Sequence, residues 1–518
     1  MEKRVVIAVV LSVLILLGYQ VVMTKMYPNA SQTVTQKVPA PVAIPSPSQE
    51  KPSISIAASQ EELFTKETGK YILTFSNIGG KIKEVMIKDY AKTLLERDLG
   101  IVTGFENAVF KLSQRGNSVV YTYQDQNLQL IKIFNFSEEK YIIDMEIIFN
   151  NISTQTNGLS YRIYNSTLDL ERYTKDELVA RDKYFLEFSI SLPDKIIRKN
   201  FQAALKGEQT FFEKATWVGV RDRYFCSMLF PLSPISKVFI KPIGRQSVTT
   251  GIETVALDIP PATKYTFYCS YYIGPQDLKL LSDAHAGSEN IVSFGTFDII
   301  SQSLLYAMRF LDGYLHSWGI CVLLISFLVF LVLYPLTAKS LSSMKKMQEL
   351  QPQIERLREQ FKDQPQKLNK EIMDLYKGHK INPFGGCLPM FLQIPVFFGL
   401  YQALMRSVEL KGAKFLWIKD LSEPDRLITL NNSLPLIGKD INILPIIMII
   451  GMFFQQKMSM KSSTSSTMQE QQKIMMFAFP LLFGYLFYHF PSGLTLYWVS
   501  YTILSLLAQR LATRAERK

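Results

Sequence analysis

Six long apolar segments constrain the fold of this chain more than any other feature of its sequence. The first lies within residues 1–26, where a basic "MEKR" precedes about nineteen largely apolar residues, enough to span a bilayer. Five more follow at 318–336, 384–405, 441–456, 474–490 and 494–511. We therefore predict a polytopic α-helical membrane protein with six transmembrane helices, five of which form a core over residues 315–518. Residues 1–26 are expected to stay attached as a signal anchor, because no convincing cleavage site follows them.

The overall composition indicates a large water-soluble part as well. Hydrophobic residues make up 47% of the chain and charged residues 20%, with a mean hydropathy of +0.08. The net charge of +12 is compatible with nucleic acid binding. However, Lys and Arg cluster beside the apolar segments, as they do in cytoplasmic loops. We expect no specific DNA partner, and ribosomal RNA at a docked ribosome is the remaining nucleic acid alternative.

Charge also predicts the orientation of the chain in the membrane. With a cytoplasmic N-terminus, alternation places 27–314 and 406–440 outside, and 337–383, 457–473 and the C-terminal tail inside. About nineteen Lys and Arg then lie inside, against about six in the outer 406–440 loop, as the positive-inside rule requires. Both termini are therefore expected in the cytoplasm.

Between the first two apolar segments, the sequence predicts a disordered linker followed by a β domain. Residues 27–62 are rich in Pro, Ser, Gln, Thr and Ala, which is typical of an extended tether. Residues 63–288 alternate between apolar and polar positions, with hairpin turns at Gly79-Gly80 and at 137–140. So many strands, joined by polar turns, predict a large β-super-sandwich outside the membrane.

We expect neither catalysis nor a metal or other cofactor in this domain. None of the four histidines pairs in sequence with an evident nucleophile and acid, and the cysteines show no metal-ligand spacing. The domain is expected to act as a folded spacer or a partner-binding surface. A sugar-binding or sugar-converting module is the alternative, because super-sandwiches occur in such enzymes. Cys226 and Cys269 are expected either as a disulfide or as two buried thiols.

Two amphipathic regions flank the second apolar segment. Residues 292–314 place aromatic side chains on one side and Asp298, Arg309 and Asp312 on the other. This pattern predicts a helix that lies in the membrane interface, on the outer surface of the membrane that the apolar segments span. Residues 338–382 predict a cytoplasmic hairpin of two helices joined at Gln364-Pro365. Its apolar seam comprises Met344, Met347, Leu350, Ile354, Leu357, Phe361, Leu368, Ile372 and Leu375. The remaining surface is expected either to dock a partner or simply to be solvated.

The apolar segments carry polar residues that a lipid-facing helix would not tolerate. They are Ser326, Gln393, Gln402, Gln455, Gln456, Tyr485, Thr495, Tyr497, Trp498, Ser500, Thr502 and Ser505. Each one by itself is more often an interhelical hydrogen bond than a functional group. Together they predict an uncharged polar concavity among five helices. Because no ionised residue lies deep in a segment, an ion-coupled transporter is disfavoured, although a transporter or channel with a periplasmic binding domain remains the alternative function.

Several stretches are similar to one known family. They are "LYPLTAKSLSSMKKMQELQP", "NPFGGCLPMFLQIPVFFGLYQALMRSVEL" and "FPSGLTLYW", supported by "YILTFSNIGGKIKEV", "RDRYF" and "YYIGPQDLKLL". These motifs resemble the YidC/Oxa/Alb family of membrane protein insertases, in its Gram-negative form with a periplasmic domain. The resemblance implies location in the bacterial inner membrane. It also implies insertion and folding of nascent membrane proteins through a groove open to the cytoplasm and the lipid, with a hydrophobic slide along the second and sixth spans.

The resemblance further implies partners but no cofactor. The partners are nascent membrane proteins, the lipid bilayer, Sec translocon components, and the ribosome and targeting factors at the cytoplasmic hairpin and C-terminal tail. Family members act alone or beside the Sec translocon and also as folding chaperones. No nucleotide, cofactor or metal is needed, so no catalytic residue is expected.

Site residues carry over position by position. The groove arginine that is usual in the family falls on Phe330, four residues before Tyr334, and here it is replaced by an aromatic ring. Phe330 is therefore expected either to belong to the slide or simply to pack. The substrate-groove candidates are Ser326, Gln393, Gln456, Tyr497 and Trp498. Pro389 and Pro395 are expected to deform the third span, and Gly385 and Gly386 to separate it from the hairpin.

Overall fold

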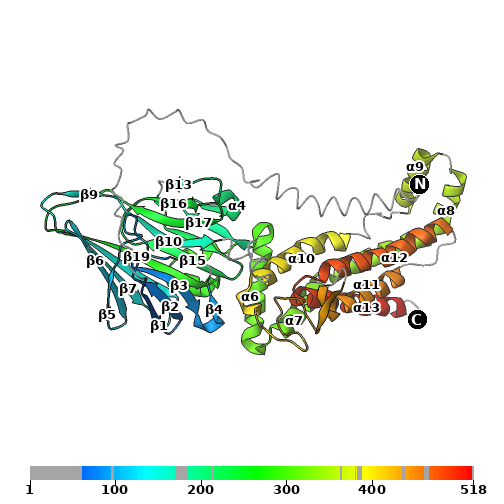
Figure 1. Cartoon of the computed structure of the whole chain (residues 1–518). Helices are drawn as coiled ribbons and strands as arrows, with labels where there is room; N and C mark the ends of the chain where they lie inside the picture. Colours follow the sequence, from blue (N-terminus) through cyan, green and yellow to red (C-terminus); the bar gives the residue numbers. More distant parts are fainter. Residues whose placement is uncertain are drawn as a thin grey trace. The chain divides into compact units, whose positions relative to one another are not determined.

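The computed structural model describes residues 61–94, 98–169, 185–211, 214–361, 364–379, 381, 388–434, 438–459 and 466–515. The chain divides into two compact units, 1–292 and 293–518 (Figure 1). The predicted anchor at 1–26 and nearly all of the predicted linker at 27–62 lie outside the described residues.

The first unit is built around a nine-stranded antiparallel sheet. Its order is β12 (Ile196–Asn200), β11 (Glu187–Ser191), β14 (Trp217–Arg221), β15 (Phe225–Pro231), β19 (Lys264–Pro275), β8 (Ile142–Asn151), β7 (Leu128–Phe136), β6 (Ser118–Gln124) and β5 (Lys111–Arg115). Buried and less buried side chains alternate in β7, so one face of the sheet enters the core there, whereas β14 and β15 are buried on both faces. The predicted hairpin turning at 137–140 is confirmed, because β7 and β8 pair from Phe136 and Ile143 onward.

Smaller sheets cover this large sheet. One has the order β10 (Arg162–Asp169), β17 (Ser247–Thr254), β16 (Ile235–Ile243) and β13 (Gln209–Phe211), and packs on β14 and β15. Another comprises β1 (Leu63–Glu67), β2 (Tyr71–Ser76), β3 (Lys81–Ile87) and β4 (Lys92–Thr93), and β18 (Leu257–Ile259) pairs with β9 (Asn157–Leu159). The predicted β-sandwich is therefore present in the first unit (Figure 1). Short helices α4 (Phe201–Ala204) and α5 (Leu278–Ala284) complete it.

The two cysteines of this unit are separate buried thiols. Cys226 lies opposite Gly274 in the β15–β19 pair, whereas Cys269 lies opposite Pro231. Their positions on the strand pair therefore differ by five residues (226 against 231), far beyond the span of a disulfide. Of the two alternatives, the structure selects the thiols.

In the fold of this unit, His285 lies beside a hydroxyl and an acid. The Ser270 hydroxyl donates to Asp144 Oδ1 at 2.7 Å, and His285 Nε2 lies 3.2 Å from the same hydroxyl oxygen. The serine, rather than the histidine, is thus the central member. Its proton is already directed to Asp144 and its side chain is buried, so His285 has no serine proton to remove. The arrangement is not a catalytic triad.

The second unit is helical, and all five predicted C-terminal apolar segments contain helices. The helices are α6 (Asp298–Leu315), α7 (Trp318–Glu349), α8 (Gln351–Gln360), α9 (Pro365–Gly378), α10 (Leu388–Arg406), α11 (Ile443–Ser459), α12 (Ser466–Phe487) and α13 (Ser492–Ala515). Among the described residues, only Trp318–Ser340 of α7 is long and apolar enough to cross a membrane by itself. Ile443–Met458 and Met476–Phe487 are shorter apolar helices.

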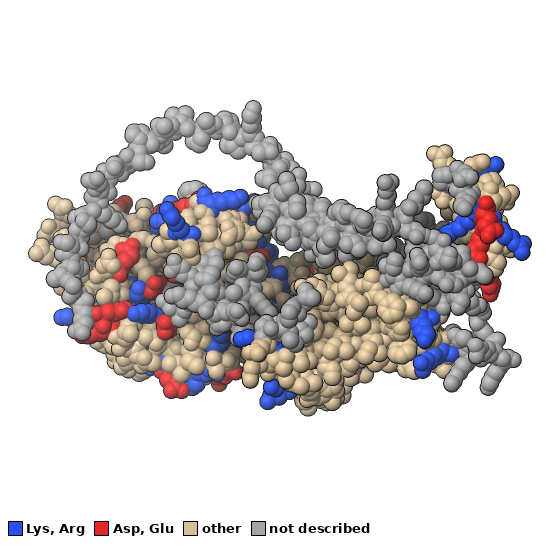
Figure 2. All heavy atoms as spheres, turned by 45° about the vertical axis from the view of Figure 1, so that its right-hand side comes forward, with Lys and Arg blue, Asp and Glu red and all other residues tan. Residues whose placement is uncertain are grey.

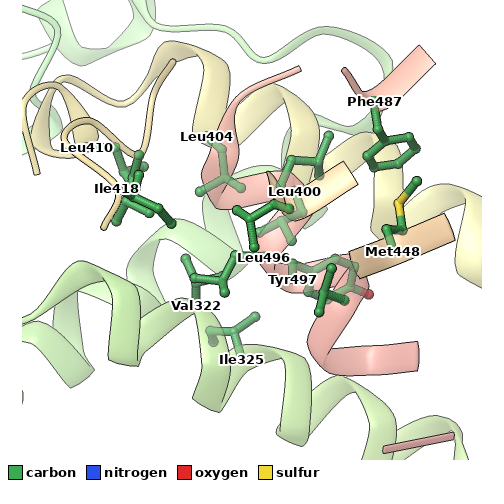
Figure 3. Close-up of a cluster of buried hydrophobic side chains, with 14 of the residues drawn as sticks. Val322, Ile325, Leu400, Leu404, Leu410, Ile418, Met448, Phe487, Leu496 and Tyr497 are labelled. Carbon is green, nitrogen blue, oxygen red and sulfur yellow. The ribbon is translucent and has the colours of Figure 1, made fainter. Parts of the chain in front are cut away.

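One apolar core joins these helices, except for α8 and α9. Side chains from α6, α7, α10, α11, α12, α13 and the segment after α10 contribute to it, including Val322, Leu400, Met448, Phe487 and Tyr497 (Figure 3). Helix α13 contacts α7, α10 and α11, so it lies centrally in the bundle.

The predicted cytoplasmic hairpin begins later than expected. Helix α7 continues through Pro335 as far as Glu349, so no break occurs at residue 338. The chain instead bends at Leu350, from which α8 and α9 extend as the two arms. Leu350, Ile354 and Ile381 are buried together, with Ile372 and Leu375 against them, so this part of the predicted apolar seam is confirmed. The seam holds the bend as well as the arms.

Helix α6 overlaps the predicted amphipathic segment 292–314 and has a buried and an exposed face. Ser301, Leu305 and Met308 are buried, and the helix contacts α7 and α10. Ile299, Tyr306, Phe310 and Tyr314 are exposed. After α10, a strand pair that the sequence analysis did not predict, β20 (Ile428–Leu434) and β21 (Gly438–Ile441), leads into α11.

Candidate functional site

Three of the five groove candidates meet where α7, α10 and α13 come together. The Ser326 hydroxyl donates to the carbonyl of Val322 at 2.8 Å, one turn earlier in α7, and lies 3.4 Å from the carbonyl oxygen of Tyr497 in α13. The Tyr497 hydroxyl accepts a hydrogen bond from Gln393 Nε2 of α10. We call Ser326, Gln393 and Tyr497 the polar cluster. They come from segments far apart in the chain, so only the tertiary fold brings them together.

Gln393 is the member with unused hydrogen-bonding capacity. Its side chain is only 7% exposed, and its Oε1 has no partner within the part of the chain that the structure describes. A buried acceptor without a donor costs about 1–3 kcal/mol. The cluster can therefore accept a hydrogen bond from an N–H or O–H group that reaches it.

The polar cluster carries no charge. Among the described buried residues of the helical unit, the only Asp, Glu, His, Lys or Arg is Asp425, which lies elsewhere. Its carboxylate accepts hydrogen bonds from the amides of Ile443 and Leu444, capping α11, and from Trp417 Nε1. Sequence analysis missed this capping role. The acidic residue lies eighteen positions before the helix that it caps, so no local pattern indicates it.

Trp498 does not join the polar cluster. Its ring lies 5.5 Å from that of Phe397, 5.4 Å from Phe487 and 6.0 Å from Phe483, inside an aromatic cluster. Successive helical residues point about 100° apart, so Tyr497 and Trp498 serve different faces of α13. A direct role of Trp498 in substrate contact stays a prediction.

Gln456 is also apart from the polar cluster. It lies near the C-terminal end of α11 and is half-buried, without a hydrogen bond to the cluster in the described part of the chain. The hydroxyls of Thr495 and Ser500 bond to carbonyls four residues earlier, those of Pro491 just before α13 and of Leu496 within it. Such bonds leave them less available to a ligand. The polar cluster therefore contains only some of the polar residues that the sequence places in the apolar segments.

Phe330 lies one turn after Ser326 and is packed. It is 9% exposed, with its ring 5.7 Å from that of Tyr334 and 5.8 Å from that of Tyr501. An aromatic group therefore occupies the position beside the polar cluster where the resemblance expects a cation. This geometry agrees with the packing alternative, and a role of Phe330 in the slide stays a prediction.

The two prolines of the third apolar segment occupy different places in α10. Pro389 is its second residue, where a proline fits the first turn of a helix. Pro395 lies inside the helix, where it removes a backbone donor and disturbs the hydrogen-bond ladder. Any deformation of the helix interior is therefore expected from Pro395 rather than from Pro389. Gly385 and Gly386 lie outside the described residues.

The outer surfaces of α7 and α13 are apolar. Leu328, Leu331 and Val332 are exposed on α7, and Ile503 and Leu507 on α13. These two helices contact each other, and Figure 2 shows a largely uncharged surface over the middle of the helical unit, with Lys and Arg near its ends. Large exposed apolar surfaces of this kind are covered by lipid or by a partner.

Comparisons with known proteins identify the family. Two sequence families match, "60Kd inner membrane protein" over 310–518 and "YidC periplasmic domain" over 101–307. A membrane protein insertase YidC from Pelobacter propionicus is 31% identical, and one from Geobacter metallireducens is 32% identical. In each case the match covers 98% of both chains. The chain belongs to the YidC family of membrane protein insertases.

Membership in the YidC family explains the division of the chain. The helical unit corresponds to the inner-membrane part, and most of the β unit to the periplasmic domain. This is an inner-membrane protein with a periplasmic domain, and its relatives are named for membrane insertion, which is not an enzymatic reaction.

Solved structures are similar over different parts of the chain. A crystal structure titled as an active YidC insertase with its first transmembrane domain resolved is 17% identical, with a TM-score of 0.41, and the match covers 87% of this chain and 93% of that one. A galactose mutarotase related enzyme from Lactobacillus acidophilus is 10% identical, with a TM-score of 0.32, and the match covers 41% of this chain and 97% of that one.

Proposed function

We propose that this insertase transfers nascent membrane proteins by offering their polar segments the polar cluster while their apolar segments leave along α7 and α13. The observation that carries the proposal is the buried, uncharged cluster of Ser326, Gln393 and Tyr497, with an acceptor that has no partner. It lies in the same bundle as the exposed apolar surfaces of α7 and α13. No nucleotide, metal or other cofactor takes part.

Hydrogen-bond exchange would keep the free-energy cost of entry low for a polar segment of the client. A client N–H group can donate to Gln393 Oε1, and a client carbonyl can accept from the Tyr497 hydroxyl, whose oxygen accepts from Gln393 Nε2. The client thus exchanges hydrogen bonds to water for hydrogen bonds to the cluster, so the net cost is small compared with leaving a polar group bare in lipid. Burial of these residues in the resting state means that the bundle must open before a client reaches them.

Transfer into lipid supplies the driving force for the apolar segment. Each buried CH₂ group contributes about 0.8 kcal/mol, so a client helix gains many kcal/mol on leaving water. The exposed side chains Leu331 and Val332 of α7 and Leu507 of α13 support a slide at this surface. On this view the slide consists of outward-facing residues, and packed Phe330 contributes from behind them.

Helix lengths support a locally thinned bilayer around the bundle. Helix α11 has 17 residues, or about 26 Å of rise. A bilayer core is about 30 Å thick.

We propose six membrane spans with both termini cytoplasmic: an anchor at 1–26, a linker at 27–62, a periplasmic domain at 63–288, an interfacial helix at 292–314 and a core at 315–518.

The cytoplasmic arms would meet the synthesis machinery. Helices α8 and α9 expose charged side chains of both signs, such as Arg358, Glu359 and Lys370, around their apolar seam. We propose that they dock ribosomes and targeting factors together with the C-terminal tail, and that Sec translocon components join for larger clients. Charged surfaces of this kind are suited to rapid, salt-sensitive encounters.

Reconstitution tests the proposal directly. Liposomes containing only this protein receive a short client that does not require Sec, and protease protection reports its insertion. Gln393→Leu should lower insertion several-fold, since an interhelical polar partner contributes up to about 1.7 kcal/mol. Gln402→Leu, the same change at a half-buried position of the same helix, should not. Equal insertion by both variants would overturn the role of the cluster, and ion flux without insertion would favour a transporter or channel.

A further inference from the structure

The outer loop after α10 contains a tight turn whose tip is a leucine. Phe415 and Ile418 exchange two backbone hydrogen bonds, at 3.0 and 2.8 Å, so Leu416 and Trp417 form the turn. Leu416 is 75% exposed, and its φ of +52° lies in the left-handed region. A leucine at this position combines backbone strain with an apolar side chain in solvent, although a glycine would avoid both.

The base of this turn is fixed in the helical core. Ile418 is buried, and Trp417 Nε1 donates to the buried Asp425. The ring of Phe415 packs so closely on Gly319 of α7 that a Cβ there would approach it to 2.1 Å. The exposure of Leu416 is therefore built into a rigid turn.

The turn adjoins the end of the helix that is long enough to cross the membrane. Gly319 is the second residue of α7, whose apolar span begins at Trp318. A tryptophan at the start of a span is typical of the bilayer interface. Exposed Tyr314 lies one turn earlier in the chain, at the end of α6. Leu416 thus lies at the level where apolar surface first meets headgroups.

Two cations flank the tip. Lys414 and Lys419 are both exposed, and within the described residues neither has an ion-pair partner. The acids of the same loop are engaged elsewhere: Glu409 pairs with Arg309, and Asp420 accepts hydrogen bonds from Ser422. An apolar tip between two exposed ammonium groups is complementary to a bilayer surface with negative charge.

We propose that the 414–419 turn is a lipid anchor, in which Leu416 enters the outer leaflet and Lys414 and Lys419 bind the phosphates of anionic phospholipids. The anchor would hold the outer end of α7 at a fixed depth while clients pass along its surface. This proposal rests on the proposed orientation, which places the 406–440 loop on the outer side.

The test measures depth with a nitroxide on Leu416→Cys in the full-length protein. Vesicles contain phosphatidylethanolamine with phosphatidylglycerol, or phosphatidylcholine alone. Oxygen and a water-soluble nickel complex compete to relax the label. We expect an oxygen-accessible label in the anionic vesicles, and a water-accessible one at Asn431→Cys, an exposed position of the same loop. Unmodified protein taken through the same labelling measures any background from native cysteines.

Replacing the lysines tests the charge. In Lys414→Gln/Lys419→Gln the ratio of immersed to water-exposed label should fall about fivefold per lysine in anionic vesicles, and it should change little in phosphatidylcholine. Lys439→Gln, which removes another exposed lysine of this loop, serves as the matched control. A tip label that is water-accessible in both vesicle types overturns the anchor.

A second label distinguishes a wrong lipid anchor from a wrong membrane placement of α7, on which the proposed function depends. A nitroxide on Val332→Cys reports the exposed face of α7. If it is immersed while the tip is not, the anchor is wrong and the membrane placement stands. If neither is immersed, the placement of α7 is wrong as well.

Discussion

At the scale of single residues, the Tyr497 hydroxyl connects the polar cluster across two helices. It is the described partner of Gln393, and it is fully buried. Tyr497→Phe should therefore leave the N–H group of the Gln393 side chain without its acceptor and lower the stability of the bundle by about 1–2 kcal/mol. Thermal unfolding in detergent measures the change. Tyr485→Phe, which removes an exposed hydroxyl from α12, is the control and should have little effect.

Lys132 is the most unusual residue of the β unit. It is fully buried, its ammonium donates to the carbonyls of Gly79 at 2.6 Å and Gly100 at 2.9 Å, and it lies 4.9 Å from the centre of the Phe110 ring. The Gly79-Gly80 turn has positive φ at both residues, so the lysine holds a turn that only glycine forms easily. The alternation of β7 places Lys132 on the inward face with Leu130 and Phe134, but the sequence does not indicate which groups would satisfy its ammonium there.

Burial makes the stability of this unit depend on pH. It lowers the pKa of Lys132 to about 7. The unfolded value is about 10.4. Between these values the unfolded chain binds a proton that the folded chain lacks, so the free energy of unfolding should rise with pH. We expect amide exchange in β2 and β3 of the full-length protein to slow from about pH 7 to 9, after correction for the intrinsic exchange rate.

Lys132→Met is the matching variant. It removes the titrating group, so this rise with pH should disappear, and it leaves three carbonyls without their donor, which should cost about 2–4 kcal/mol. Lys83→Met removes a partly exposed lysine that pairs with Glu61, and it should keep the pH dependence. Persistence of the rise in Lys132→Met would assign it to another group.

At the scale of elements, α10 separates the effects of its two prolines. Pro395 interrupts the helix interior, whereas Pro389 lies in the first turn. Pro395→Ala should straighten and stabilise the helix. We expect client insertion to fall several-fold if the deformation positions Gln393, two residues away. Pro389→Ala should leave insertion near the wild-type level. Unchanged insertion in the double variant would refute a mechanical role for either proline.

Helix α6 is attached to the rest of its unit by an ion pair. Arg309 forms hydrogen-bonded contacts with Glu409 in the 3₁₀ turn Val408–Leu410 after α10, and both side chains are mostly buried. A double-mutant cycle with Arg309→Gln and Glu409→Gln should give a coupling energy of about 1 kcal/mol, measured by unfolding in detergent. Additive effects of the two changes would show that α6 is held by its apolar face alone.

At the scale of the whole molecule, Phe330 tests whether insertion needs a buried cation. The ring is enclosed by those of Tyr334 and Tyr501. In the reconstituted assay, Phe330→Arg should change insertion by less than about threefold, the equivalent of one interhelical hydrogen bond of ~0.6 kcal/mol. Val332→Arg, two residues further along α7 on its exposed face, should lower insertion by disturbing the slide. Insertion that appears only in Phe330→Arg would show that charge is required and that the wild-type chain acts mainly as a Sec-associated chaperone.

The sequence by itself determined which kind of secondary structure each of the two units contains. Apolar segments long enough for helices, and alternation typical of a sandwich, follow from backbone hydrogen bonding and burial, which act locally and leave periodic patterns. The motifs around Tyr334, Pro389 and Tyr497 indicated the family for the same reason, since they can be read in a single stretch of chain.

Only the tertiary structure decided which residues share a surface. It placed Tyr497 with Gln393 and Trp498 with Phe487, since neighbours in a helix point in different directions. It also separated Cys226 from Cys269 through strand register. These outcomes depend on contacts between residues far apart in the chain, where packing and register select one partner among many that the sequence leaves equally available.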